Sequence, residues 1–343
     1  MYKLPLEQMQ ALFTALSAQS TLYLPQGQGQ IVEFKPWQDG DEARLDVLNT
    51  SVSAKQLFFP QNEDYALFKR DGKELDISQQ EPSDEKFIAF GVRHCDAKSL
   101  EILDSVFLDE PVDTYYQARR ENGTVIINSC TQPAETCFCT AFGINPMGTA
   151  GDVTIWMDEQ FLYWKPVTEK GQALTDKVTD VLQQEVADDL EAIYQLNKKA
   201  KEAIKENPFS NINLDVFKEE NLNQLFDSPK WAELSKACIG CGTCTYVCPT
   251  CQCYDVRDYD TGNSVIRSRC WDSCMYSDFT MMAHGNPRKT QLERFRQRFM
   301  HKLVYHPANH EGTYSCVGCG RCLTKCPVSI NIVKVIKALG VES

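Results

Sequence analysis

The sequence predicts three parts: an α/β domain over residues 1–170, a helical linker over 171–228 and an all-α, cysteine-rich domain over 229–343. In the first part, short apolar runs alternate with helical periodicity, and a charged helical pattern follows it. Of the 16 cysteines, twelve lie after residue 237, which marks a separate unit. At roughly 150 residues per domain, 343 residues are enough for two domains with cores of their own.

The composition excludes several classes of function. A net charge of −12 argues against general binding to nucleic acid or to anionic membranes, because both need a basic surface. No run approaches the ~18 uncharged apolar residues of a membrane span, and no signal peptide is recognisable. We therefore expect a cytoplasmic location, where thiols stay reduced and clustered cysteines usually serve metal or redox chemistry.

The first part combines helical and strand patterns. Residues 1–16 have the spacing of an amphipathic surface helix. The apolar run 86–92 is expected to be a strand, followed by a helix over 96–107 that Asp96 is placed to cap. Further strands are expected at 124–127, 153–156 and 161–164.

Helical patterns dominate the remainder of the chain. Apolar residues recur at intervals of three and four over 168–206, and a polar stretch over 209–228 leads to the cysteine-rich part. Two further helices are expected at 290–305 and 330–339. These patterns carry no catalytic signature, since no dinucleotide-binding glycine motif, P-loop or nucleophile elbow is present.

Two copies of one cysteine motif carry the chemistry. Each has the spacing C-x2-C-x2-C-x3-C-P, in which three thiolates ligate one [4Fe-4S] cluster and the fourth ligates the neighbouring cluster. Zinc would explain pairs of cysteines but not the third cysteine and the Cys-Pro ending. We predict that one cluster is held by Cys238, Cys241, Cys244 and Cys326, and the other by Cys316, Cys319, Cys322 and Cys248.

The segment between the two motifs is long and basic. The segment is too long for a compact β-hairpin ferredoxin, in which the two motifs lie close together in sequence. The helical pattern of the segment predicts an all-α, ferredoxin-like dicluster domain, as in the iron–sulfur subunit of succinate dehydrogenase. Part of this segment carries six cations and one anion, Glu293. These cations either form a solvated helix face or offset the negative charge of the clusters. These cations are Arg288, Lys289, Arg294, Arg296, Arg298 and Lys302.

Four cysteines lie in the α/β part, at or just after expected strand ends, where ligand-binding residues of such sheets collect. They are Cys95, Cys130, Cys137 and Cys139. Three interpretations stay open: a third iron–sulfur cluster, buried thiols that pack as small apolar groups, and zinc-binding or redox-active thiols. Cys95 would lie beside a helix N-terminus, which favours a thiolate.

The last four cysteines surround the first motif and its insert. Cys251 and Cys253 follow the motif directly, whereas Cys270 and Cys274 lie further along the insert. Ligation is one interpretation, but the spacing favours thiols that pack around the two clusters.

Several particular segments resemble a single family. They are residues 90–96 (FGVRHCD), Tyr115 and Tyr116 with Arg119 and Arg120, Cys130 with residues 136–139 (TCFC), residues 248–251 (CPTC) and residues 271–274 (WDSC). The chain resembles the dicluster [4Fe-4S] subunits that include the A subunit of anaerobic sulfite reductase and the β subunit of sulfhydrogenase. The resemblance extends from about residue 58 to the second motif.

This resemblance implies an electron-transfer subunit with no catalytic residues of its own. Its expected partners are a flavin-containing NAD(P)H or ferredoxin oxidoreductase subunit and a catalytic subunit, either a sirohaem sulfite reductase or a nickel–iron hydrogenase. It also favours a third cluster in the α/β domain. The alternative is an enzyme whose N-terminal cysteines act directly on a sulfur or disulfide substrate, with the dicluster domain as electron donor.

Overall fold

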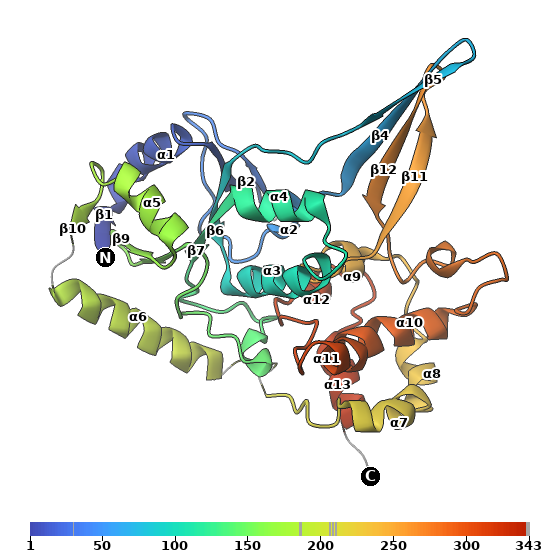
Figure 1. Ribbon diagram of the computed structural model, residues 1–343. Helices are drawn as coiled ribbons and strands as arrows, with labels where there is room; N and C mark the ends of the chain where they lie inside the picture. Colours follow the sequence, from blue (N-terminus) through green and yellow to red (C-terminus); the bar gives the residue numbers. More distant parts are fainter. Residues whose placement is uncertain (30, 185–186, 206, 208, 210, 341–343) are drawn as a thin grey trace.

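The computed structural model describes residues 1–343 except 30, 185–186, 206, 208, 210 and 341–343. Over the described residues, the chain forms an eight-stranded mixed sheet, a four-stranded antiparallel sheet and a helical region next to both (Figure 1). No helix among these residues is long and apolar enough to cross a membrane.

The larger sheet is mixed because its centre is parallel and its edges are antiparallel. Parallel pairing joins β2 to β6, β6 to β7, and β7 to β8. In spatial order, the strands are β10 (Gln183–Gln184), β1 (Tyr2–Pro5), β9 (Phe161–Pro166), β8 (Val153–Met157), β7 (Gly123–Asn128), β6 (Phe87–Val92), β2 (Thr21–Gln28) and β3 (Ile31–Pro36). The four strands expected at 86–92, 124–127, 153–156 and 161–164 are therefore confirmed as β6 to β9.

Helices cover both faces of this sheet. Side chains alternate along β6, so that Ile88 joins the core under α1 (Met9–Ser17) and α5 (Glu169–Lys177), while Ala89 joins the opposite core. That second core lies under α2 (Lys55–Phe58), α3 (His94–Phe107) and α4 (Thr114–Asn122). A longer helix, α6 (Ala187–Lys205), packs Ile193 against Trp156 and Tyr163.

The smaller sheet joins parts of the chain that are far apart in sequence. Its order is β11 (Tyr254–Asp260), β12 (Ser264–Trp271), β4 (Asn62–Asp71) and β5 (Glu74–Gln79), and it projects from the rest of the molecule (Figure 1). In the register of β12 with β4, Ser264 is opposite Lys69 and Cys270 is opposite Asn62. This sheet therefore crosses the expected boundary between the first and the last part.

The expectation of an all-α C-terminal domain is wrong, because β11 and β12 lie between the two cysteine motifs. Their hairpin closes at Gly262, which has φ 88°, and the Gly262 amide donates to the Asp260 carboxylate at 2.7 Å. A positive φ is readily adopted by glycine, so the turn is encoded locally. Pairing with β4 then provides hydrogen-bond partners for the backbone groups along the other edge of β12.

Three local expectations need correction. Residues 1–16 begin with strand β1 and a short 3-10 turn (Leu6–Gln8) before helix α1. The 168–206 pattern is two helices, α5 and α6, separated by β10, and its last residue lies outside the described residues. Asp96 does not cap α3: Arg93 holds the N-cap position, and the Asp96 carboxylate binds Arg321 instead.

The helical region is built around a core that includes Trp231, Phe295, Phe299, Leu303 and Ile336. The helix α10 (Gln291–Met300) begins with a capping box formed by Thr290 and Glu293, and continues as a π-helical turn (His301–Tyr305) into α11 (His306–Asn309). The other helices are α7 (Leu222–Phe226), α8 (Lys230–Ser235), α9 (Thr243–Tyr246), α12 (Arg321–Thr324) and α13 (Ile332–Gly340). Further 3-10 turns are Cys139–Phe142, Glu219–Asn221 and Asp278–Thr280.

Candidate iron–sulfur centre

Four cysteines from both motifs line one cavity in the helical region, together with Arg298. Three come from the first motif, and the fourth reaches the cavity from the end of the second. These cysteines are Cys238, Cys241, Cys244 and Cys326. The fold thus brings together the four cysteines expected to share one cluster, three from the first motif and the last cysteine of the second.

Hydrogen bonds hold several sulfur atoms of this first group in place. The side-chain amide of Gln291 donates to Cys238 Sγ at 3.2 Å, and the backbone amide of Ile330 donates to Cys326 Sγ at 3.2 Å. The side-chain and backbone hydrogen bonds of Thr243 lower the pKa of Cys241. Donors of this kind stabilise thiolates and, in iron–sulfur proteins, raise the reduction potential of the cluster.

The second group comprises Cys248, Cys316, Cys319 and Cys322. Cys316 and Cys322 each interact electrostatically with Cys248 and Cys319, so all four lie close together. Burial raises the pKa of Cys316 to about 12. The Cys251 thiol, and then the Lys302 ammonium, hold the pKa of Cys248 below its usual range. As free thiols, the buried members would stay protonated, and a metal or a buried cation is needed to keep them as thiolates.

Two of the six cations in the insert are buried against these groups. Lys302 is 3% exposed and donates from Nζ to Cys248 Sγ at 3.3 Å, as well as to Thr250 Oγ1 at 2.9 Å. Burial opposes the charged form of Lys302, but the nearby thiols outweigh it and raise the pKa of Lys302. Arg298 is 4% exposed and interacts with Cys244 of the first group and Cys322 of the second.

The other four cations have different surroundings. Arg296 stacks on Phe226 at 3.5 Å from the ring centroid, and Arg294 donates to the backbone carbonyl oxygens of Met275 and Arg288. Lys289 is exposed. Compensation of thiolate charge therefore applies to Arg298 and Lys302, which lie four residues apart on one face of the helical segment.

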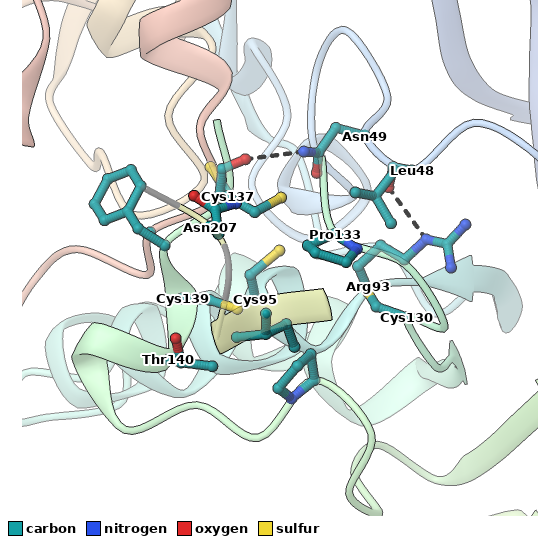
Figure 2. Close-up of a pocket in the computed structure, with 15 residues that line it drawn as sticks. Leu48, Asn49, Arg93, Cys95, Cys130, Pro133, Cys137, Cys139, Thr140 and Asn207 are labelled. Atoms are coloured by element: carbon teal, nitrogen blue, oxygen red, sulfur yellow. Dashed lines mark hydrogen bonds between the residues drawn. The ribbon is translucent and has the colours of Figure 1, made fainter. Parts of the chain in front are cut away.

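The four cysteines of the α/β part also gather around one cavity (Figure 2). Cys95 lies in the first turn of α3 and Cys130 follows β7, so both extend from carboxyl ends of parallel strands. Cys137 comes from the loop after Cys130 and Cys139 begins the 3-10 turn that follows, and Cys319 of the second group lines the same cavity. All four predicted members are thus close to each other and to the second group.

Burial dominates the electrostatics of this third group. It raises the pKa of Cys137 to about 11 and of Cys139 to about 12, and it also raises the pKa values of Cys95 and Cys130. The thiolate expected for Cys95 at a helix N-terminus is therefore disfavoured in the metal-free protein. A neutral, buried thiol is a poor nucleophile, which argues against direct attack on a sulfur substrate.

The third group is tied to the second motif by close contacts. The Phe138 amide donates to the Gly318 carbonyl oxygen at 2.8 Å, and the Asn49 side-chain amide donates to the Cys319 carbonyl oxygen at 2.9 Å. A Cβ atom on Gly318 would lie 2.5 Å from the Phe138 backbone, so only glycine permits this approach. The buried ion pair of Asp96 with Arg321 lies beside Cys95 and Cys319.

The motif spacing, with its third cysteine and Cys-Pro ending, favours [4Fe-4S] clusters over zinc. Sulfurs on a tetrahedral zinc lie only about 3.8 Å apart, for a Zn–S bond of about 2.3 Å. The cysteine sulfurs that ligate a cubane lie further apart, because each binds a different iron.

Comparisons with known proteins agree with this geometry. Residues 237–330 match the family model of the 4Fe-4S dicluster domain, so the chain carries two [4Fe-4S] clusters. Over 337 residues, the chain is 32% identical to sulfhydrogenase 2 subunit beta of Pyrococcus furiosus, an alignment that covers 97% of this chain and 96% of that protein. No solved structure matches the chain significantly.

Proposed function

Because the chain belongs to the family of the sulfhydrogenase β subunit, as its motifs predicted, we propose that it relays electrons within a multisubunit anaerobic oxidoreductase. Iron–sulfur clusters exchange single electrons without binding a substrate. The observation that carries the proposal is that two groups of four cysteines are brought together, with Arg298 facing both.

The chain's own residues supply ligands, charge and protection from water. Arg298 and Lys302 offset the negative charge of the thiolates, and hydrogen bonds from Gln291 and Ile330 fix two sulfur atoms. Burial of these groups lowers the local dielectric constant, so each cation has a larger effect than it would have in water.

We further propose a third iron–sulfur cluster on Cys95, Cys130, Cys137 and Cys139. This cluster would extend the electron relay, because Cys319 of the second group lines the same cavity. Support comes from the cavity that these four cysteines line together, which offers the four sulfur ligands of a cubane. Burial raises the pKa values of Cys137 and Cys139, which argues against the alternative in which these cysteines act on a sulfur or disulfide substrate.

For the complex, we propose two kinds of partner. A flavin-containing NAD(P)H or ferredoxin oxidoreductase subunit would exchange electrons with one end of the relay. A catalytic subunit, of the nickel–iron hydrogenase or the sirohaem sulfite reductase type, would exchange them with the other. Support for the first catalytic type comes from the name of the relative, which is a subunit of a sulfhydrogenase. A cytoplasmic location suits such a complex.

The test is chemical analysis of iron and acid-labile sulfide in chain purified without oxygen. The proposal requires at least about eight of each per chain, and Cys137→Ala should remove about four more irons than the control Cys270→Ala does. Cys270 is a suitable control because it lies on strand β12, outside all three groups. Stoichiometric zinc without sulfide would contradict the electron relay, and an unchanged iron content in Cys137→Ala would contradict the third cluster.

A further inference from the structure

Three cysteines outside these groups converge from two segments of the insert. Cys251 and Cys253 follow the first motif, and Cys274 follows strand β12. The Asp272 amide donates to the Cys253 carbonyl oxygen at 2.9 Å, which holds the two segments side by side. The thiols of Cys253 and Cys274 are in hydrogen-bond contact, and Cys251 interacts electrostatically with Cys274.

A buried lysine faces this convergence of thiols. Lys55 is 2% exposed, and its Nζ donates to the Cys251 carbonyl oxygen at 2.9 Å and lies 3.6 Å from the centroid of the Trp271 ring. Burial lowers the pKa of Lys55 to about 8, and the groups that oppose this are Cys251, Cys248 of the second group and Cys253. No carboxylate of the described residues forms an ion pair with it within 4.0 Å.

The buried ammonium group of Lys55 is therefore stabilised by negative charge nearby. An ammonium removed from water costs several kcal/mol unless negative charge is supplied nearby. Cluster-bound thiolates at Cys251 and Cys253 would add to the negative charge that Cys248 of the second group supplies to Lys55.

We propose that Cys251, Cys253 and Cys274 bind a further iron–sulfur cluster, with Lys55 as the balancing charge. Three thiolates leave one iron of a cubane for a ligand other than cysteine, such as water.

The position of this site suits a branch of the relay. Cys274 interacts electrostatically with Cys244 of the first group, and Cys251 contacts Cys248 of the second group. Electrons arriving at either group could therefore reach the new site. The inference rests on the proposed function, because it assumes that the chain is loaded with iron and sulfide.

The experiment compares Cys253→Ser, Cys274→Ser and the double variant with Cys270→Ser, in full-length chain purified without oxygen. Iron, sulfide and zinc are measured per chain, and the reduced proteins are examined by electron paramagnetic resonance. Each single variant should lose three or four irons with matching sulfide, the double variant should lose no more than either single one, and Cys270→Ser should lose none. The resonance signals of the two motif-bound clusters should keep their intensity.

Several results would overturn the inference. Full iron content in both single variants would show that the thiols only pack, and loss of zinc in place of iron would identify a different metal. If the variants fail to fold, Mössbauer spectroscopy of the wild-type chain decides: iron found only in fully cysteine-ligated cubanes refutes the site, and an iron with a non-cysteine ligand supports it. Absence of sulfide from the wild-type chain would instead defeat the proposed function itself.

Discussion

Replacement of Lys302 by methionine removes one buried positive charge while keeping a long side chain in its place. Lys302 Nζ lies 3.3 Å from Cys248 Sγ, and the side chain is 3% exposed. Reduction adds one electron to a cluster that is already anionic, so a nearby cation stabilises the reduced state. The variant should therefore lower the reduction potential of the cluster that Cys248 ligates.

The size of the shift follows from Coulomb's law. With the added charge spread over the cluster at about 6 Å from the ammonium and an effective dielectric constant of about 20, the interaction is about 3 kcal/mol. For one electron, about 1.4 kcal/mol corresponds to about 59 mV, so the potential should fall by about 0.1 V. Loss of the hydrogen bond to sulfur acts in the same direction.

A redox titration monitored by electron paramagnetic resonance measures this shift. The matched control is Lys289→Met, which removes the same charge from an exposed position of the same insert. Solvent and salt screen that charge, so the control should change the potential by less than about 0.02 V. Equal shifts in both variants, or a shift below about 0.03 V in Lys302→Met, would refute the idea that buried cations tune the clusters.

Three further predictions concern other buried charges. Arg298→Gln should lower the potentials of both motif-bound clusters in the same titration, because Arg298 faces Cys244 and Cys322; a shift in only one would contradict this. Asp96→Asn should destabilise the holoprotein by about 3–5 kcal/mol in thermal unfolding, because it leaves Arg321 unpaired, whereas Asp46→Asn at the exposed Arg44 pair should cost less than about 1 kcal/mol. Burial lowers the pKa of His301 to about 4 against about 6.5 when unfolded, so acidification protonates the unfolded chain first. About 2 kcal/mol of stability should be lost between pH 7 and pH 5, and His301→Gln should reduce that loss; an unchanged pH dependence would disprove this role.

Local sequence patterns predicted the elements that depend on neighbours in the chain. Strand β6 is a continuous apolar run, and α10 begins at a capping box formed by Thr290 and Glu293. The crossed grouping of the motif cysteines could also be predicted, because the spacing alone determines which thiolates share a cluster. All of these features are set within a few residues or by a repeated motif.

Features that depend on distant contacts were missed. Strand β12 needs β4 as its partner, and no local pattern indicates that pairing. Asp96 looked like a helix cap because aspartate favours that position, but its carboxylate binds Arg321, 225 residues away. The convergence of Cys253 with Cys274 likewise depends on the β11–β12 hairpin, which returns the chain to the first motif.

The burial of Arg298 and Lys302 could have been predicted from one additional observation. They are four residues apart in a helical segment, so they share a face, and Phe299 and Leu303, which follow them, lie in the core. A cationic pair on a partly buried face implies an anionic partner inside the protein, since a buried cation is otherwise costly.

The same reasoning gives the overall charge of the protein a functional meaning. The chain has a net charge of −12, yet the buried cations Lys55, Arg298 and Lys302 face cysteines rather than carboxylates. Arg321 interacts electrostatically with both a carboxylate, Asp96, and a cysteine, Cys319. If the thiols served only as packing groups, these cations would have no anionic counterpart. Cluster binding therefore accounts for both the cysteines and the cations, and loss of the clusters should destabilise the fold around them.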